Sequence, residues 1–177
     1  MQRVEFLNYP ASEQPAHLLW GIRIDGTDLR VHTADATREL WRPELEDETE
    51  AEQAHFLLRQ HDGLYVSEVS DPVRHFLGAP AAEFVGFGAE TTPVLGCFCG
   101  LWGCWCLLTV ITSAPDIVTW FPFRQPDREQ WGELPMGPYV FARPAYEAAL
   151  AAPTRLSEDP LGPGLASLEA EIAAEIA

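Results

Sequence analysis

The chain has 177 residues, 47% of them hydrophobic, which suits one globular domain with a sizeable buried core. Its formal net charge is −16, because 27 acidic residues outnumber 11 basic ones, all of them arginine. Proteins that bind a phosphate backbone need a positive surface, so this charge argues against a nucleic-acid partner. The charge either steers a basic protein partner toward the chain or serves only to keep the protein in solution.

Two segments bear on the location of the protein. Residues 1–5 lack the cationic start and apolar run of a secretory leader, so we expect a cytoplasmic protein with reduced thiols. Residues 91–115 carry no charge, but three glycines interrupt them and no arginine flanks either end. We therefore expect no membrane association.

The first third of the chain predicts strands followed by a helix. The expected elements are a strand over residues 3–8, a hairpin formed by residues 18–24 and 29–33, and a helix from about residue 49 to residue 61. The helix is expected because Thr49 and Glu52 have the spacing of a capping box.

The middle of the chain predicts three strands around a short helix. The expected elements are strands over residues 64–69, 94–99 and 104–111 and a helix over residues 72–77. Asp71 and Pro72 suit the start of that helix, and Gly78 suits its end.

The last third predicts two strands, a helix and a tail. The expected elements are a strand over 116–121, a loop over 122–138, a strand over 139–141, a helix over 143–151, a Pro/Gly linker over 153–164 and an amphipathic helix over 165–177. The fold class is therefore α+β, a largely antiparallel sheet with helices on one face, formed by a single domain of residues 1–152. The final helix either folds back on this domain or mediates self-association.

Four cysteines lie within ten residues, at Cys97, Cys99, Cys104 and Cys106. A hairpin with a four-residue loop over 100–103 would pair Cys99 with Cys104 and Cys97 with Cys106. Because side chains alternate along a strand, all four sulfurs would then share one face of the hairpin.

A cysteine cluster of this kind has four possible roles. The cysteines are small apolar core residues, ligands of a metal, partners in two cross-strand disulfides, or catalytic thiols. A reducing compartment disfavours disulfides, and the nearest arginines in sequence are far from the cluster, which disfavours a catalytic thiol. Zinc, copper or an iron–sulfur cluster would be the metal group, although two C-x-C pairs differ from the usual zinc spacing.

The sequence contains no other motif that indicates metal binding, catalysis or nucleotide binding. The histidines have no metal-binding spacing, so each is expected to be a surface or capping residue: His17, His32, His55, His61 and His75. The chain also lacks a nucleophile elbow, a P-loop and a dinucleotide fingerprint. We therefore expect a protein without enzymatic activity.

A run of acidic residues, called the acidic patch below, precedes and begins the helix predicted near residue 49. Its members are Glu44, Glu46, Asp47, Glu48, Glu50 and Glu52. The patch is the candidate binding site for a basic protein. Its alternative role is local, because negative charge stabilises a helix N-terminus.

Residues 95–152 resemble a group of small, mostly actinobacterial proteins of unknown function. The resemblance is carried by Leu95-Gly96-Cys97-Phe98-Cys99-Gly100, Gly103-Cys104-Trp105, Val118-Thr119-Trp120, Phe123-Arg124-Gln125-Pro126 and Phe141-Ala142-Arg143-Pro144-Ala145-Tyr146-Glu147. It implies a shared fold and no particular activity. Members often have another residue in place of Cys106, so the resemblance implies that three cysteines and tight glycine turns are the shared feature.

Two functions follow from these features. The first is a non-enzymatic, acidic, cytoplasmic binding protein, in its most concrete form an immunity or antitoxin-like protein that binds a basic protein. The second is a thiolate metal-binding or redox protein that uses Cys97, Cys99, Cys104 and Cys106.

Overall fold

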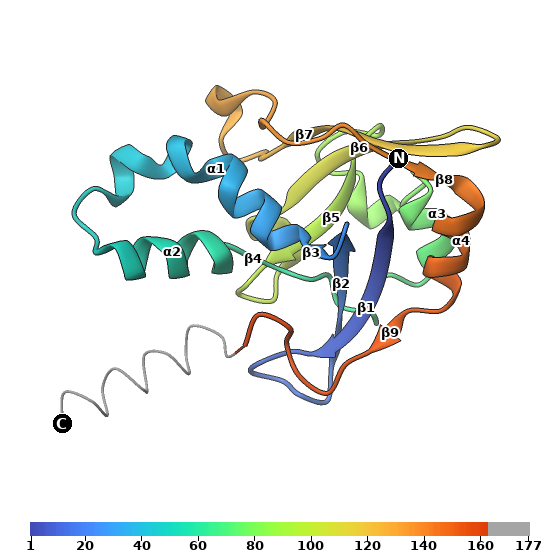
Figure 1. Cartoon of the computed structure of the whole chain (residues 1–177), viewed down its shortest axis with the longest axis horizontal. Helices are drawn as coiled ribbons and strands as arrows, with labels where there is room; N and C mark the ends of the chain where they lie inside the picture. The colour runs from blue at the N-terminus through green and yellow to red at the C-terminus, as the bar shows by residue number, and fades with distance from the viewer. Residues whose placement is uncertain (163–177) are drawn as a thin grey trace.

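Residues 1–162 are described by the structure, a computed structural model, and they form an α+β fold (Figure 1). The four helices are α1 (Leu29–Leu45), α2 (Glu50–Arg59), α3 (Pro72–Phe76) and α4 (Arg143–Ala151). The antiparallel pair α1 and α2 lies at one end of the molecule, and α4 lies at the other end. The predicted fold class is confirmed.

The strands form two sheets. The first has the order β3 (Thr27–Asp28), β2 (Leu18–Ile24), β1 (Val4–Pro10) and β9 (Thr154–Arg155). The second has the order β4 (His61–Asp62), β5 (Thr92–Cys97), β6 (Leu107–Ser113), β7 (Ile117–Arg124) and β8 (Tyr139–Ala142). All neighbours are antiparallel except β1 and β9, which are parallel.

Backbone hydrogen bonds connect the first sheet with the chain at each edge of the second sheet, next to β1 and β8 and just after β4. The N–H of Gln2 donates to the carbonyl of Val140, and the N–H of Trp20 donates to the carbonyl of Leu64, each at 2.8 Å. The sheets therefore curl around one shared core. Its buried members come from both sheets and from α3 and α4, and they include Phe6, Ile22, Phe76, Leu107, Trp120 and Tyr146.

Local capping signals predicted three helices correctly. The capping box is present at α2, where the Thr49 N–H donates to Glu52 and the Glu52 N–H donates to the Thr49 hydroxyl. At α3, the Asp71 carboxylate accepts the N–H of Arg74, and Gly78 follows with a φ of +92°. Helix α4 begins near the predicted start.

Two predicted strands are wrong. Residues 29–33 begin α1 instead of completing a hairpin, because the Asp28 carboxylate accepts the N–H of Arg30 at 2.9 Å and starts a helix there. Strand β2 pairs instead with β1 along its whole length. Residues 64–69 make a single bridge, Tyr65 with Leu19, because the chain turns away at Ser67.

The predicted linker is also wrong over its described part. Residues 154–155 form β9 against β1, and Asp159 is buried, so this segment packs as part of the domain. The predicted helix over 165–177 lies outside the described residues. Among the residues described, no helix has both the length and the apolar character needed to span a membrane.

A buried network of charges attaches this C-terminal segment. Arg30 in α1 contacts Asp28 and Asp159, each at 2.9 Å, and Asp62 in β4 at 3.4 Å. Arg59 in α2 reaches Asp159 at 2.9 Å. Both guanidinium groups lower the pKa of the Asp159 carboxyl group, although burial acts in the opposite direction.

We predict that Asp159→Ala destabilises the protein by about 3–5 kcal/mol, because the substitution removes a buried carboxylate that two buried arginines contact. Urea unfolding measures the change. Asp35→Ala is the matched control, since Asp35 pairs with Arg38 on the exposed surface; it should cost less than about 0.5 kcal/mol. Equal costs for the two variants would contradict the role assigned to the buried network.

Candidate metal centre

The cysteines lie on a longer connection than the predicted hairpin loop. Strand β5 ends at Cys97 and β6 begins at Leu107, so nine residues join them. The segment from Cys97 to Cys106 is called the cysteine loop below. It contains a short 3₁₀ turn, Trp102–Cys104, in place of a tight four-residue turn. Cys99 and Cys104 are therefore loop residues, and their predicted strand pairing is wrong.

The register of β5 and β6 separates Cys106 from the other three cysteines. Leu95 lies opposite Leu107, whereas the predicted pairing would have placed Leu95 opposite Leu108. A shift of one residue turns every side chain of a strand to the opposite face. The Cys106 side chain is completely buried, and it lies outside the group formed by the other sulfurs.

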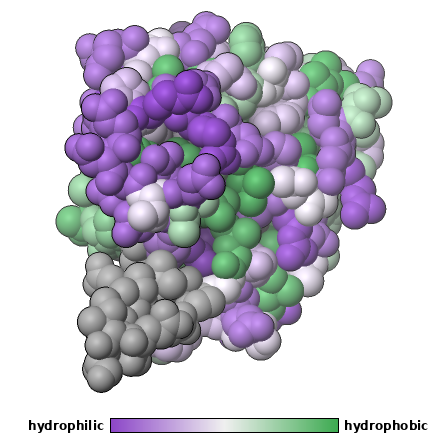
Figure 2. Space-filling view, turned by 60° about the vertical axis from the view of Figure 1, so that its left-hand side comes forward, coloured by the Kyte–Doolittle hydropathy of each residue, from purple (hydrophilic) through white to green (hydrophobic). Residues whose placement is uncertain are grey.

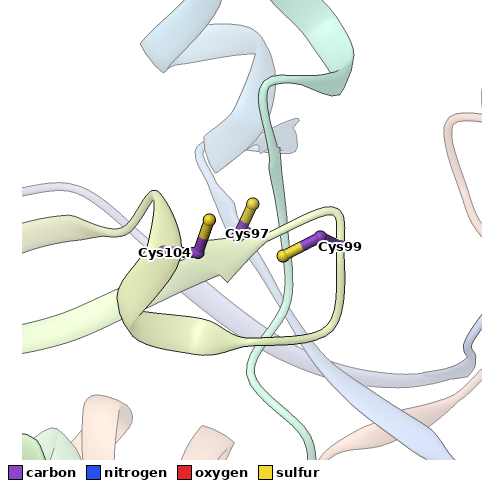
Figure 3. Close-up of side chains that lie close together, drawn as sticks. All are labelled: Cys97, Cys99 and Cys104. Atoms are coloured by element: carbon purple, nitrogen blue, oxygen red, sulfur yellow. The ribbon is translucent and has the colours of Figure 1, made fainter.

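The remaining sulfurs form one group. The ligand atoms of Cys97, Cys99 and Cys104 all lie within 4.8 Å of one another. Figure 3 shows that Cys97 at the end of β5 and Cys104 on the 3₁₀ turn lie side by side, with the sulfur of Cys99 directed back toward them. Cys97 is buried, and Cys99 and Cys104 are exposed.

Two glycines allow the loop to fold over in this way. Gly100 has a φ of +90°, a conformation that residues with a side chain rarely adopt, and it directly follows Cys99. A Cβ atom on Gly96 would lie 3.2 Å from the Cα of Trp102, so the 3₁₀ turn packs closely on this glycine. These contacts bring Cys104 over the end of β5.

His61 on β4 holds the two ends of the loop together. Its Nδ1 lies 3.3 Å from the carbonyl oxygen of Gly96 and 3.2 Å from that of Trp105. Because carbonyls only accept hydrogen bonds, Nδ1 carries the proton. His61 and His75 are both buried, so the expectation that every histidine is a surface or capping residue is wrong for these two.

Tryptophan side chains fix the loop on its flanks. Trp102 packs against Phe84 with 4.9 Å between ring centroids, and Trp105 packs against Trp41 of α1 at 5.5 Å. Arg128 lies over the Trp41 ring at 4.6 Å and over the Trp105 ring at 5.6 Å. The loop thus contacts the α1–α2 pair on one side.

The thiols differ in acidity. Burial, together with the thiols of Cys99 and Cys104, raises the pKa of Cys97 to about 12. Burial also raises the pKa of Cys99, but hydrogen bonds from the Leu101 backbone and from the other two thiols outweigh it, and the net shift is downward. Burial raises the pKa of Cys106 to about 12. Cys99 therefore has a greater thiolate character than Cys97 or Cys106.

Three thiols at this spacing suit a soft metal ion. Zinc bonded to sulfur at about 2.3 Å holds its thiolates about 3.8 Å apart, so the three sulfurs need to approach by only about 1 Å. Copper(I) prefers the same donor atoms. An iron–sulfur cluster commonly uses four cysteines, and the sulfur of Cys106 does not belong to the group.

The acidic patch lies at the turn between α1 and α2, and all six of its members are exposed. Two of them have structural partners: Glu44 binds Arg128, and Glu52 completes the capping box of α2. A hydrogen bond from Glu48 to Glu52 and the charge of Glu52 raise the pKa of Glu48. Hydrophilic residues dominate the end of the molecule that Figure 2 brings forward.

Sequence reasoning missed three residues of this site: His61, Trp105 and Arg128. His61 and Arg128 act through contacts that only the fold creates, with β5 and with α1. A hairpin that pairs Cys99 with Cys104 would also place Trp105 opposite Phe98, whereas the structure packs Trp105 on Trp41.

No protein-family model, curated protein or solved structure matches this chain. The resemblance noted for residues 95–152 therefore stays a prediction. The geometry of the cysteine loop and the charged surface beside it are the features that point to a function.

We predict that stability falls as the pH drops from about 6.5 to about 4. Burial lowers the pKa of His61 from 6.5 to about 4, so in this window the unfolded chain binds a proton that the folded protein excludes. The contribution of His61 is complete above pH 6.5, and about 2–3 kcal/mol of it is lost by pH 4.5.

Urea unfolding at several pH values tests this expectation. His61→Gln should flatten the profile relative to the native protein, whereas His17→Gln, at an exposed position, should leave it unchanged. An identical slope for the native protein and His61→Gln would show that His61 titrates normally in the fold.

Proposed function

We propose that the protein binds one thiophilic metal ion, zinc in the first instance, through Cys97, Cys99 and Cys104. The observation that carries this proposal is the convergence of three sulfur atoms to within 4.8 Å of one another. They come from a strand end, the turn before Gly100 and a 3₁₀ turn, all within the cysteine loop. Thiolates are preferred ligands of zinc and copper(I).

An interpretation of the cysteines as quiet core residues suits only the two buried ones, Cys97 and Cys106. Cys106 is completely buried, as a small apolar side chain would be. Cys99 and Cys104 are exposed, so burial of apolar surface does not account for their position next to Cys97. All four are free thiols, as the proposal requires, and the reducing cytoplasm would keep them so.

Elemental analysis of protein purified without a metal-affinity step tests the proposal. We expect one zinc or copper ion per chain, and a loss of metal affinity of at least about tenfold on Cys99→Ser or Cys104→Ser, since each removes one of three ligands. Cys106→Ala is the matched control from the same loop. It should retain the metal while costing about 1–3 kcal/mol of stability, because it leaves a small cavity.

Two results would contradict the proposal. One is a metal content well below one ion per chain that added zinc does not raise. The other is equal loss of metal from Cys106→Ala and Cys104→Ser, which would assign the ion to a site that the three-sulfur group does not describe.

The second candidate is an acidic binding protein, in its most concrete form immunity or antitoxin-like, whose acidic patch recognises a basic protein. The specific observation in its favour is that all six carboxylates of the acidic patch are exposed around the turn between α1 and α2, where a hydrogen bond and the charge of Glu52 raise the pKa of Glu48. A basic side chain at this turn would relieve the repulsion between Glu48 and Glu52. Charges of this kind act mainly on the rate of association.

We predict that neutralising Glu46, Asp47, Glu48 and Glu50 to glutamine or asparagine leaves the fold intact and slows association with a basic partner. The effect should shrink as salt rises, because exposed charges are screened. Binding kinetics at two salt concentrations, on a partner captured from the source organism, measure it. The matched control neutralises four other exposed acidic residues: Glu83, Glu90, Asp116 and Glu158. Equal slowing by both variants would assign the effect to net charge and remove the patch from the interface.

A further inference from the structure

The proposed metal site supplies three ligands, whereas zinc bound to protein takes four. Across residues 1–162, the group with suitable ligand atoms contains Cys97, Cys99 and Cys104 and no other histidine, cysteine or acidic residue. The remaining cysteine of the loop, Cys106, lies outside this group. A zinc ion here would therefore have one coordination position for a ligand from elsewhere.

That position faces the surface of the molecule. Cys97 is 5% exposed and forms the floor of the site, while Cys99 and Cys104 are exposed. Figure 3 shows the side chains of Cys97 and Cys104 side by side and the sulfur of Cys99 directed toward them from the bend of the loop. An ion held among them would be approached from the side of Cys99 and Cys104.

Large exposed apolar side chains lie on the cysteine loop and in contact with it. Phe98 is 56% exposed and directly precedes Cys99, and Leu101, two residues after Cys99, is 71% exposed. Phe87 is 41% exposed and contacts Trp102 of the same loop. Exposed apolar residues that cluster in this way mark a binding surface.

The charge around the loop selects the kind of partner. The neighbouring α1–α2 pair carries the acidic patch, and its Trp41 packs directly on Trp105 of the loop. The nearby Arg128 is already bound to Glu44, and the protein as a whole has a net charge of −16. A second copy of the chain would be repelled, whereas a basic protein would be attracted.

We infer that a cysteine of a basic partner protein, docked on Phe98 and Leu101, supplies the fourth ligand of the metal. This inference rests on the proposed function. The partner thiol releases its proton to solvent, and its sulfur then bonds to the ion without any change in oxidation state. The metal then links the two proteins, and the ion reaches the four-coordinate state of structural zinc sites, for which four cysteines are one common ligand set.

Cobalt(II) in place of zinc makes the fourth ligand visible, because each cobalt–thiolate bond adds charge-transfer absorption. The protein is the Cys106→Ala variant, so that Cys106 cannot move in as a ligand. The probe is a synthetic ten-residue peptide with one cysteine, two leucines and four arginines. Two control peptides carry serine in place of the cysteine, or glutamates in place of the arginines.

The cysteine–arginine peptide should raise the charge-transfer absorption by about a third and saturate at one peptide per chain, as the number of cobalt–sulfur bonds goes from three to four. The serine peptide should leave the absorption unchanged. Phe98→Ser combined with Leu101→Ser should weaken peptide binding about tenfold or more, because apolar contacts are lost. The glutamate peptide should bind more weakly than the arginine peptide, with a difference that vanishes at high salt.

The possible results distinguish a failure of this inference from a failure of the proposed metal binding. A protein without cobalt–thiolate absorption before any peptide is added would overturn the proposed function. A three-thiolate spectrum that the cysteine–arginine peptide does not change would overturn the inference alone. Equal binding of the arginine and glutamate peptides would refute a basic partner, and unchanged binding by the double serine variant would refute docking on Phe98 and Leu101.

Discussion

The buried guanidinium of Arg30 joins parts of the chain that are far apart in sequence. It bonds to Asp28 at the start of α1, to Asp62 in β4 and to Asp159 near the end of the described residues. Removing these charges from water is costly, and only their close mutual contacts offset that cost. The network therefore requires α1, β4 and the C-terminal segment to be in place together, so it links their formation during folding.

The same network supports the cysteine loop through β4. Asp62 lies opposite Gly96 of β5, and the preceding residue, His61, lies opposite Cys97. The position of this two-residue strand thus decides where the His61 imidazole meets the carbonyls of Gly96 and Trp105. A histidine that is not a metal ligand in our proposal therefore sets the spacing of the three sulfurs through the backbone.

Helices with local start and stop signals were predictable from the sequence, as Thr49 with Glu52 and Asp71 with Pro72 show. Helix α1 was not, because residues 29–33 alternate like a strand and the deciding features are the Asp28 cap and the burial of Arg30. An arginine usually lies on a solvated face of a helix or strand. Here ion pairs with Asp28 and Asp159 allow Arg30 to be buried. The short strand β9 was missed for a similar reason, since a segment rich in proline and glycine is held by Asp159.

The proximity of the cysteines was also predictable from the sequence. That Cys106 lies apart from the group of Cys97, Cys99 and Cys104 was not. Neighbouring C-x-C pairs indicate clustered sulfurs. The face on which Cys106 lies depends instead on the register of β5 and β6, which shifts at an irregularity between Pro93 and Leu95. Register is set by core packing across the whole sheet, and a local pattern does not contain that information.

The position of Trp105 between two of the cysteines gives the protein an optical property of its own. Its ring lies 5.5 Å from that of Trp41, and the ring of Trp131 lies 5.1 Å from Trp41. Indole rings this close couple their electronic transitions, which makes near-ultraviolet circular dichroism sensitive to small changes in their mutual orientation. Any rearrangement of the backbone at Cys104 or Cys106 therefore moves one member of the coupled set, and an unlabelled sample reports on the state of its own sulfur atoms.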